Sequence, residues 1–352
     1  MRLRRRPPPA SAPPVPLLCR WDLDKTYLRS DFDTIRSLLR TAFEKAEDKI
    51  DVPGVAELIR GLKAAAKRRH RSALVYFVSA SPPQIGRQIR RKLELDGVPY
   101  DGIVFKNQLA HLRRGKFRNL REHVGFKLAE LLRGRLDAPP EARELLFGDD
   151  WESDSLIYSL YADVLAGRLP IDRLTPVLRR IRVDPLLVEE IATLAARAVT
   201  GDLVARIFIN LERRSPPAVF RLFGPRVVPT FNYFQTAAVL AVDGHLESAD
   251  VVRVAAVLLG GAGYTARALE NSLGDLVRRG HLTRAAAETL ARALRIDGVL
   301  PPGAPDVSRW RRALQALRAR RRARRSTASA PAAPPGPLDY EAILDRLPAR
   351  TG

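Results

Sequence analysis

The sequence of 352 residues contains a single cysteine, Cys19. An intrachain disulfide is therefore excluded, and we expect a reducing, intracellular setting. Apolar runs are also short, and none approaches the roughly 20 residues that a membrane-spanning helix needs. The N-terminus passes from arginines directly into prolines, without the apolar core of a signal peptide. These absences predict a cytoplasmic protein without a transmembrane segment.

Acidic residues are scarce relative to basic ones. Lysine and arginine total 60 against 39 aspartates and glutamates, which gives a formal net charge of +21. Much of the excess lies in two segments without any acid, whose arginines are Arg2, Arg4, Arg5, Arg6, Arg318, Arg320, Arg321, Arg322, Arg324 and Arg325. Two interpretations are open: solvated tails, or segments that bind an anionic partner such as a membrane surface or nucleic acid.

The order of predicted elements indicates an α/β fold in the first half of the chain. Residues 1–14 form a basic, proline-rich leader that cannot bury a core. Apolar runs typical of buried strands occur at residues 15–21, 73–78, 103–105 and 144–147. Helical periodicity separates these runs, so residues 15–168 are predicted to form a domain with a parallel, Rossmann-like sheet.

The second half differs in pattern. Residues 169–325 show helical periodicity and few strand signals, which predicts an all-α domain. Gly-x-Leu punctuates this part at Gly167–Leu169, Gly201–Leu203, Gly244–Leu246 and Gly280–Leu282. Helical-hairpin repeats and an ordinary bundle of glycine-ended helices both explain this signature. Residues 326–352 are expected to be a flexible linker and a short tail helix, which can dock through Tyr340, Ile343, Leu344 and Leu347.

Two aspartates follow the first predicted strand. Asp22 and Asp24 are spaced i, i+2, so a strand that ends there can direct both carboxylates to the carboxyl edge of the sheet, where open α/β sheets bind ligands. One carboxylate could attack phosphorus while the other protonates the leaving oxygen and later activates water. Thr26 could orient Asp24 through a hydrogen bond. Taken alone, Asp-x-Asp-x-Thr fits a solvated acidic turn equally well.

A serine and a lysine fall at positions that suit a phosphate. Ser79 ends the second predicted strand and faces the start of a helix that Ser81 can cap, and a helix N-terminus favours anions. Lys127 lies on a later helix and could neutralise a phosphoryl oxygen at the same edge. An ordinary turn serine and a solvated lysine are the alternative interpretations.

The fourth predicted strand ends at a glycine followed by aspartates. Gly148 precedes Asp149 and Asp150, and Asp154 comes shortly after them. Carboxylate oxygens at a strand end are the ligands that Mg²⁺ prefers. The sequence therefore predicts a magnesium site at this edge.

These four motifs, in this order, resemble those of the haloacid dehalogenase (HAD) superfamily of phosphatases. Residues 17–165 look like the catalytic domain of the actin-patch phosphatidate phosphatase family. The shared signatures are Asp22-Leu23-Asp24-Lys25-Thr26, Pro53-Gly54-Val55, Val78-Ser79-Ala80-Ser81-Pro82, and Gly148-Asp149 with Asp154 and Ile157-Tyr158. The chain departs from the family's pattern at Lys25, Pro83, Phe126 and Asp150-Trp151-Glu152, which leaves the catalytic set intact.

The resemblance implies a HAD-like domain with a minimal cap, in which Asp22 is the nucleophile and Asp24 the acid/base. It implies that Ser79, Ser81 and Lys127 hold the phosphoryl group. The implied ligands of Mg²⁺ are Asp22, Asp24 and Asp149, with help from Asp150 or Asp154. The implied reaction is hydrolysis of a phosphomonoester, such as phosphatidate or another large anionic substrate, through an aspartyl-phosphate. The alternative is an inactive HAD-fold scaffold that binds an anionic partner.

Overall fold

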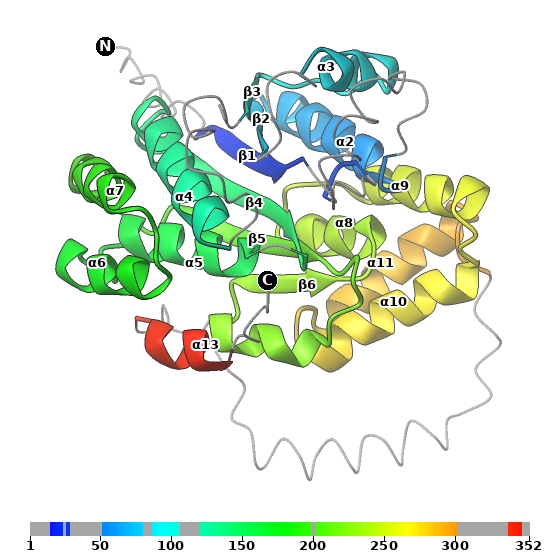
Figure 1. Ribbon diagram of the computed structural model, residues 1–352. Coiled ribbons are helices and arrows are strands. Elements are labelled where there is room, and N and C mark those ends of the chain that lie inside the picture. Colours follow the sequence, from blue (N-terminus) through cyan, green and yellow to red (C-terminus); the bar gives the residue numbers. More distant parts are fainter. Residues whose placement is uncertain are drawn as a thin grey trace, which may run out of the picture.

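The computed structural model describes residues 15–23, 26–28, 51–79, 86–105, 120–151, 153–198, 201–301 and 337–346. Within these residues, six strands form one sheet in the order β3-β2-β1-β4-β5-β6, and all neighbouring strands are parallel. The strands are β1 (Leu17–Asp22), β2 (Ala73–Ser79), β3 (Gly102–Phe105), β4 (Arg143–Asp149), β5 (Val204–Asn210) and β6 (Val227–Thr230). The predicted α/β, Rossmann-like fold is confirmed (Figure 1).

The strand order reverses beside β1. The chain runs from β1 to β2 and β3 on one side and then returns to β4, β5 and β6 on the other. Ligands of open α/β sheets bind at such a reversal, beyond the carboxyl ends of the strands. In this sheet, that place lies where β1 ends at Asp22 and β4 ends at Asp149.

The last two strands correct the sequence analysis. β5 pairs with β4, and β6 pairs with β5, although both come from residues 169–325, which were expected to be all-α. The sheet therefore does not end near residue 168. β6 contains Pro229, and a proline argues against a strand because it cannot donate a hydrogen bond to a neighbour. It is tolerated here because β6 is the last strand of this sheet.

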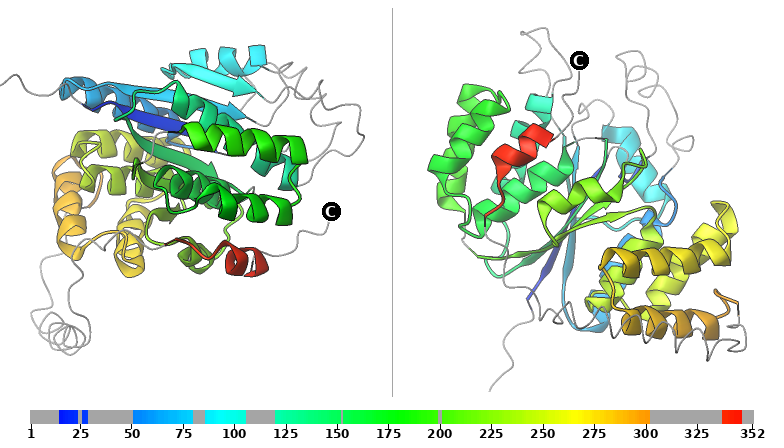
Figure 2. Two further views of the ribbon diagram at one scale, coloured as in Figure 1. Left: turned by 90° about the vertical axis from the view of Figure 1, so that its left-hand side faces the viewer. Right: turned by 90° about the horizontal axis from the view of Figure 1, so that it is seen from below.

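Helices cover both faces of the sheet, as the right-hand view of Figure 2 shows. The first hydrophobic cluster joins one face to α2 (Val55–Arg68), α3 (Gly86–Leu95), α8 (Tyr233–Val242), α9 (Ser248–Gly261), α10 (Ala266–Arg279) and α11 (Arg284–Ile296). The second joins the other face to α4 (Leu120–Leu136), α5 (Asp154–Leu165), α6 (Ile171–Arg180), α7 (Pro185–Arg197), the 3₁₀ helix η5 (Pro217–Phe223) and α13 (Tyr340–Arg346). Helices from beyond residue 169 therefore lie on both faces.

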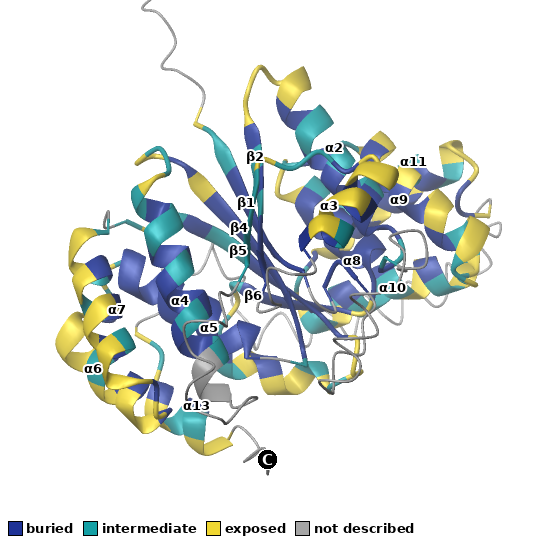
Figure 3. Cartoon of the chain, turned by 45° about the horizontal axis from the view of Figure 1, so that its top comes forward, coloured by how far each residue is buried: buried dark blue, intermediate teal, exposed yellow. Residues whose placement is uncertain are grey.

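The central strands β1 and β4 are buried on both sides between the two layers (Figure 3). In β4, Leu145 and Phe147 belong to the first cluster and Leu146 to the second. Successive side chains of a strand point to opposite faces, so a strand covered on both sides reads as a continuous apolar run. This explains why the runs at residues 73–78 and 144–147 were recognisable.

The start of α2 is built for close packing. Val55, Leu58 and Ile59 recur at helical spacing and are buried. Gly54, which precedes the helix, has a φ angle of 86°, in the left-handed region that favours glycine. A Cβ atom at this position would lie 2.7 Å from Leu258 Cδ1. Glycine therefore allows α9 to approach α2.

Two helical hairpins, α8–α9 and α10–α11, turn at glycines. Gly244 and Gly280 have φ angles of 81° and 82°. The leucine two positions later, Leu246 or Leu282, is buried in the first cluster. A left-handed glycine followed by an apolar contact is a common way to end a helix, and it accounts for the Gly-x-Leu signature at these two places.

The tail helix α13 packs into the second cluster. Tyr340 donates a hydrogen bond of 2.7 Å to an Asp163 carboxylate oxygen, and Ile343 is buried beside it. Among the described residues, no helix is long and apolar enough to cross a bilayer. The predicted leader, residues 318–325 and most of the predicted linker lie outside the described part of the chain.

Candidate active site

The predicted site residues come together at the carboxyl edge of the sheet. Asp22, Ser79 and Asp149 are the last residues of β1, β2 and β4, which are adjacent and parallel. Asp154 begins α5, and Lys127 lies on α4. All five side chains are at most 1% exposed. The expected convergence of strand ends therefore occurs.

Three carboxylates form a compact group. Oxygen atoms of Asp22, Asp149 and Asp154 lie within 4.8 Å of one another. Lys127 Nζ lies 2.7 Å from Asp22 Oδ1 and 2.6 Å from Asp154 Oδ1, so its ammonium group joins the two. The Asp149 backbone N–H donates to Asp154 Oδ2 at 3.2 Å. Lys127 thus contributes one positive charge to the carboxylate group.

The charge and chemistry of this group fit a divalent metal ion. Three buried carboxylates offer oxygen atoms within 4.8 Å of one another. Carboxylates this close together repel one another, and a hard dication that prefers oxygen ligands, such as Mg²⁺, would stabilise them. Asp22, Asp149 and Asp154 can supply the protein oxygens.

Thr26 contacts two of these carboxylates. Its hydroxyl lies 3.3 Å from Asp22 Oδ2 and 3.2 Å from Asp149 Oδ2. The sequence analysis assigned this hydroxyl to Asp24, which lies outside the described residues, as does Ser81. The contact with Asp149 links residues 123 positions apart in the chain, and no local sequence pattern indicates such a pair.

Asp150 binds backbone instead of joining the three-carboxylate group. Its two carboxylate oxygens accept hydrogen bonds from the N–H groups of Arg213 at 2.8 Å and Ser215 at 2.9 Å. The Arg213 guanidinium also lies over the Trp151 ring, 4.7 Å from its centroid. Asp150 therefore fastens the loop after β5 to the site. Sequence analysis missed this loop because it did not predict β5.

Aromatic rings stack across β1, β4 and β5 next to the carboxylate group. Trp21 stacks on Phe147 with a centroid distance of 3.7 Å, and Phe147 stacks on Phe208 at 5.3 Å. Trp21 precedes Asp22, and Phe147 lies two positions before Asp149. Such pairs contribute about 0.5–1.5 kcal/mol each beyond the burial of their area, so the ends of β1, β4 and β5 are held in register beneath the carboxylates.

Comparison with known proteins covers the part of the chain that holds this site. Residues 21–169 match the family model described as phosphatidate phosphatase APP1, catalytic domain. No curated protein and no solved structure matches the chain. The matched residues include the end of β1, all of β2 and β4, and every member of the carboxylate group, whereas β5, β6 and α8 to α11 lie outside them. Residues 21–169 are therefore similar to the catalytic domain of the phosphatidate phosphatase APP1 family.

Proposed function

We propose that the protein is a Mg²⁺-dependent phosphatase of the HAD type, which hydrolyses phosphomonoesters through an aspartyl-phosphate. The observation that carries this proposal is the buried group of Asp22, Asp149 and Asp154, joined by Lys127, at the carboxyl edge of a parallel sheet. The family match of residues 21–169 supports it independently.

Asp22 takes the role of nucleophile. One of its carboxylate oxygens forms a bond to phosphorus as the bond between phosphorus and the ester oxygen breaks, and Asp24 gives a proton to the departing alkoxide. In the second half of the reaction, Asp24 removes a proton from the water that attacks phosphorus. The phosphate is released and the Asp22 carboxylate is restored. The role of Asp24 rests on its place in the motif.

Lys127 and Ser79 bind the phosphoryl group during its transfer. Lys127 Nζ is in contact with the Asp22 carboxylate, so it can neutralise phosphoryl oxygens next to the attacking atom. Ser79 ends the neighbouring strand, and Ser81 follows it two positions later in the sequence. A Mg²⁺ ion held by Asp22, Asp149, Asp154 and the Asp24 carbonyl would supply the positive charge that lets a phosphate approach these carboxylates.

Asp22→Asn tests the proposal most directly. An amide does not attack phosphorus, and it removes a charge from the metal site, so hydrolysis of p-nitrophenyl phosphate should fall by about a thousandfold or more. Asp243→Asn is a matched control, because Asp243 pairs with Arg206 in a partly exposed ion pair and should leave the rate unchanged. Phosphate release is measured with Mg²⁺ and with a chelator. A rate that survives in Asp22→Asn would contradict the mechanism, and an inactive wild type would favour the scaffold alternative.

The finer proposal is that the substrate is phosphatidate, or another large anionic phosphomonoester, at a membrane surface. The matched family is described as a phosphatidate phosphatase. The arginines of residues 2–6 and 318–325 would add attraction to an anionic surface, at about 1 kcal/mol per basic residue close to it. A peripheral membrane location follows from this proposal.

Liposomes distinguish this substrate from soluble ones. We expect binding to vesicles that contain phosphatidate but not to neutral vesicles, together with release of phosphate. Binding should weaken as salt rises, because exposed charges are screened beyond about 10 Å at 0.1 M. Sedimentation of vesicles measures binding, and a phosphate assay measures turnover. Efficient cleavage of soluble esters by protein that binds the vesicles without cleaving phosphatidate would refute the lipid substrate. The departures from the family pattern at Phe126 and Trp151 would then be the first positions to examine.

A further inference from the structure

Thr26 contacts the carboxylates of both Asp22 and Asp149, which end two different strands. Its hydroxyl lies between Asp22 Oδ2 and Asp149 Oδ2, at 3.3 and 3.2 Å. The side chain is fully buried, so water does not substitute for either contact. A displacement of the Thr26 backbone would therefore change both contacts at once.

The Thr26 backbone is held from outside the matched family domain. Tyr233, the first residue of α8, donates its hydroxyl hydrogen to the Thr26 carbonyl oxygen at 2.6 Å, across 207 residues of sequence. Tyr233 is 2% exposed. Burial, together with the charges of Asp149 and Asp22, raises the pKa of its phenol well above the usual value. Tyr233 thus keeps its proton and remains a hydrogen-bond donor.

The Tyr233 ring makes a second connection to the site. It packs at an angle of 44° against Trp21, with ring centroids 5.8 Å apart. Trp21 directly precedes Asp22 and is fully buried. One side chain therefore contacts both the strand that delivers Asp22 and the turn that delivers Thr26.

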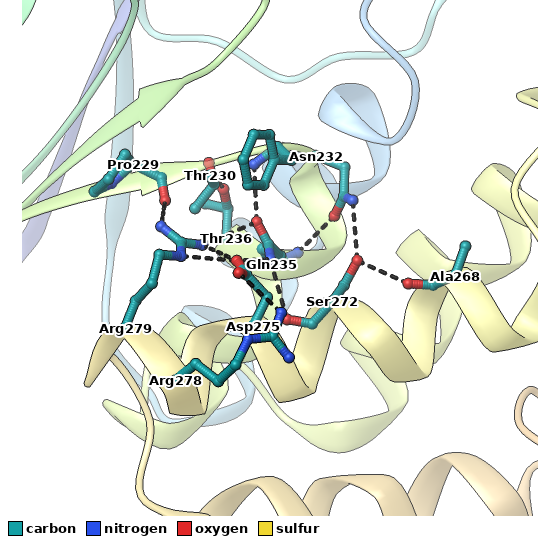
Figure 4. A network of polar contacts seen from close by, with 11 residues as sticks. Pro229, Thr230, Asn232, Gln235, Thr236, Ala268, Ser272, Asp275, Arg278 and Arg279 are labelled. Atoms are coloured by element: carbon teal, nitrogen blue, oxygen red, sulfur yellow. Dashed lines mark hydrogen bonds and ion pairs between the residues drawn. The ribbon is translucent and has the colours of Figure 1, made fainter. Parts of the chain in front are cut away.

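A polar network fixes the start of α8 (Figure 4). Tyr233 is the first residue of this helix. The Asn232 side chain accepts from the Gln235 N–H at 3.0 Å, which caps the helix, and donates to Ser272 Oγ at 3.3 Å. Gln235 donates to the Ser272 carbonyl oxygen at 3.0 Å and to Asp275 Oδ2 at 3.1 Å. Ser272 and Asp275 belong to α10. The first turn of α8 is therefore fastened to α10 on both sides of the tyrosine.

We propose that Tyr233 is a positioning residue of the active site, which holds Thr26 so that the Asp22 and Asp149 carboxylates keep the spacing that a cation needs. This inference rests on the proposed function and extends it, because it makes the α8–α10 region a necessary part of the site. Tyr233 touches neither substrate nor metal in this role. It acts through the Thr26 carbonyl.

Tyr233→Phe removes one hydroxyl and keeps the ring. Tyr340→Phe is the matched control, since Tyr340 also donates one buried hydrogen bond, to Asp163, on the opposite face of the sheet. Both variants should lower Tm by a similar small amount, about 1–3 °C. Only Tyr233→Phe should weaken binding of Mg²⁺, by roughly tenfold, as expected when a partner of the ligand shell is removed.

Binding of Mg²⁺ is measured without substrate, from the rise in Tm across a Mg²⁺ titration of the full-length chain. The kinetic counterpart is a fall in kcat for p-nitrophenyl phosphate at fixed Mg²⁺, with little change in KM. Equal Mg²⁺ affinities for Tyr233→Phe, Tyr340→Phe and the wild type would overturn the inference. A purely structural tyrosine would change Tm alone.

A double variant tests whether Tyr233 acts through Thr26. Thr26→Val keeps the carbonyl that Tyr233 binds but lacks the hydroxyl, so adding Tyr233→Phe should weaken Mg²⁺ binding no further. Independent, additive losses would overturn the inference. A wild type that neither binds Mg²⁺ nor hydrolyses esters would refute the proposed function and this inference with it. A wild type that does both, with an unchanged Tyr233→Phe, would refute the inference alone.

Discussion

Gly148 lies between the buried Phe147 and the Asp149 carboxylate at the end of β4. A Cβ atom on this residue would overlap Asp154 Oδ2 and lie 2.5 Å from Asp154 Cβ. Asp154 is held in place by Lys127 and by the Asp149 N–H. A hydrogen atom in place of a side chain is therefore what allows Asp154 to reach the group.

Gly148→Ala should disable the site and leave the fold in place. The added methyl group must push Asp154 away from Lys127, and misplacement of about 1 Å costs on the order of a hundredfold in rate. The prediction is a loss of kcat of at least that size, measured as phosphate release, with circular dichroism unchanged. Gly260→Ala is the control, because no atom lies within 4 Å of a Cβ at that position in α9. Wild-type turnover in Gly148→Ala would show that Asp154 can move freely.

Single site residues were predictable where they come at the end of an apolar run that indicates a strand. Asp22, Ser79 and Asp149 follow apolar runs, and parallel strands bring such ends to one edge. The partners of Thr26 and Asp150 were not predictable. Thr26 depends on Tyr233, 207 positions away, and Asp150 depends on a loop that follows an unpredicted strand. Such contacts are set by the tertiary arrangement and leave no local pattern.

At the scale of elements, a buried ionic cluster joins β1, β4, α4 and α5. The Glu144 carboxylate receives Arg20 Nε and an Arg135 guanidinium nitrogen at 2.8 Å each, and the Tyr161 hydroxyl at 2.9 Å. The side chains of Glu144 and Arg135 are completely buried, and that of Arg20 is 4% exposed. One carboxylate therefore holds two guanidinium groups in the interior.

Glu144→Gln should destabilise the protein strongly. Removing the negative charge leaves two buried guanidinium groups without a counterion, and breaking a buried pair in this way costs about 3–5 kcal/mol. The free energy of unfolding in urea measures the loss. Glu189→Gln, on the exposed side of α7, should change it by less than about 0.5 kcal/mol. Similar values for the two variants would mean that a neutral amide in place of the Glu144 carboxylate satisfies both arginines.

Elements were predictable where their burial was uniform. The run from Glu144 to Phe147 in β4 is buried at every position and reads as a strand. In β5, Ile207-Phe208-Ile209 carries a similar signal, but it is embedded between helical patterns that dominated the interpretation. β6 has four residues including Pro229, and its strand conformation comes from pairing with β5. Sequence periodicity identifies an element only where the residues of that element determine its conformation by themselves. The four residues of β6 do not.

For the whole molecule, the boundary predicted at residue 168 was drawn where the catalytic motifs end. The sheet continues through β5 and β6, and helices from beyond that point enter both hydrophobic clusters. Phe147 on β4 stacks on Phe208 of β5, for example. The family match ends at residue 169. The matched part therefore lacks β5, β6 and the later helices, which cover its hydrophobic core.

A fragment that stops at residue 169 should therefore not fold by itself. Without β5, the edge of β4 would be free to pair with another copy of the fragment. Apolar surface would also be exposed on both faces of the sheet. We expect aggregation, or loss of a cooperative thermal transition, in contrast to the full chain. Size-exclusion chromatography and circular dichroism measure both. A monomeric fragment with a cooperative transition would show that the smaller, 15–168 unit is a domain after all.

The contact between Tyr233 and Thr26 also has a consequence for synthesis. Asp22 and Thr26 leave the ribosome early, yet Tyr233, whose hydroxyl binds the Thr26 carbonyl, follows 207 residues after Thr26. At about 5–20 residues per second, this separation corresponds to roughly 10–40 s of translation. Parallel pairings between distant segments also form slowly. Under the proposed function, a nascent chain would thus carry Asp22 and Thr26 for many seconds before Tyr233 is made, so hydrolysis would begin only after about two thirds of the chain has been synthesised.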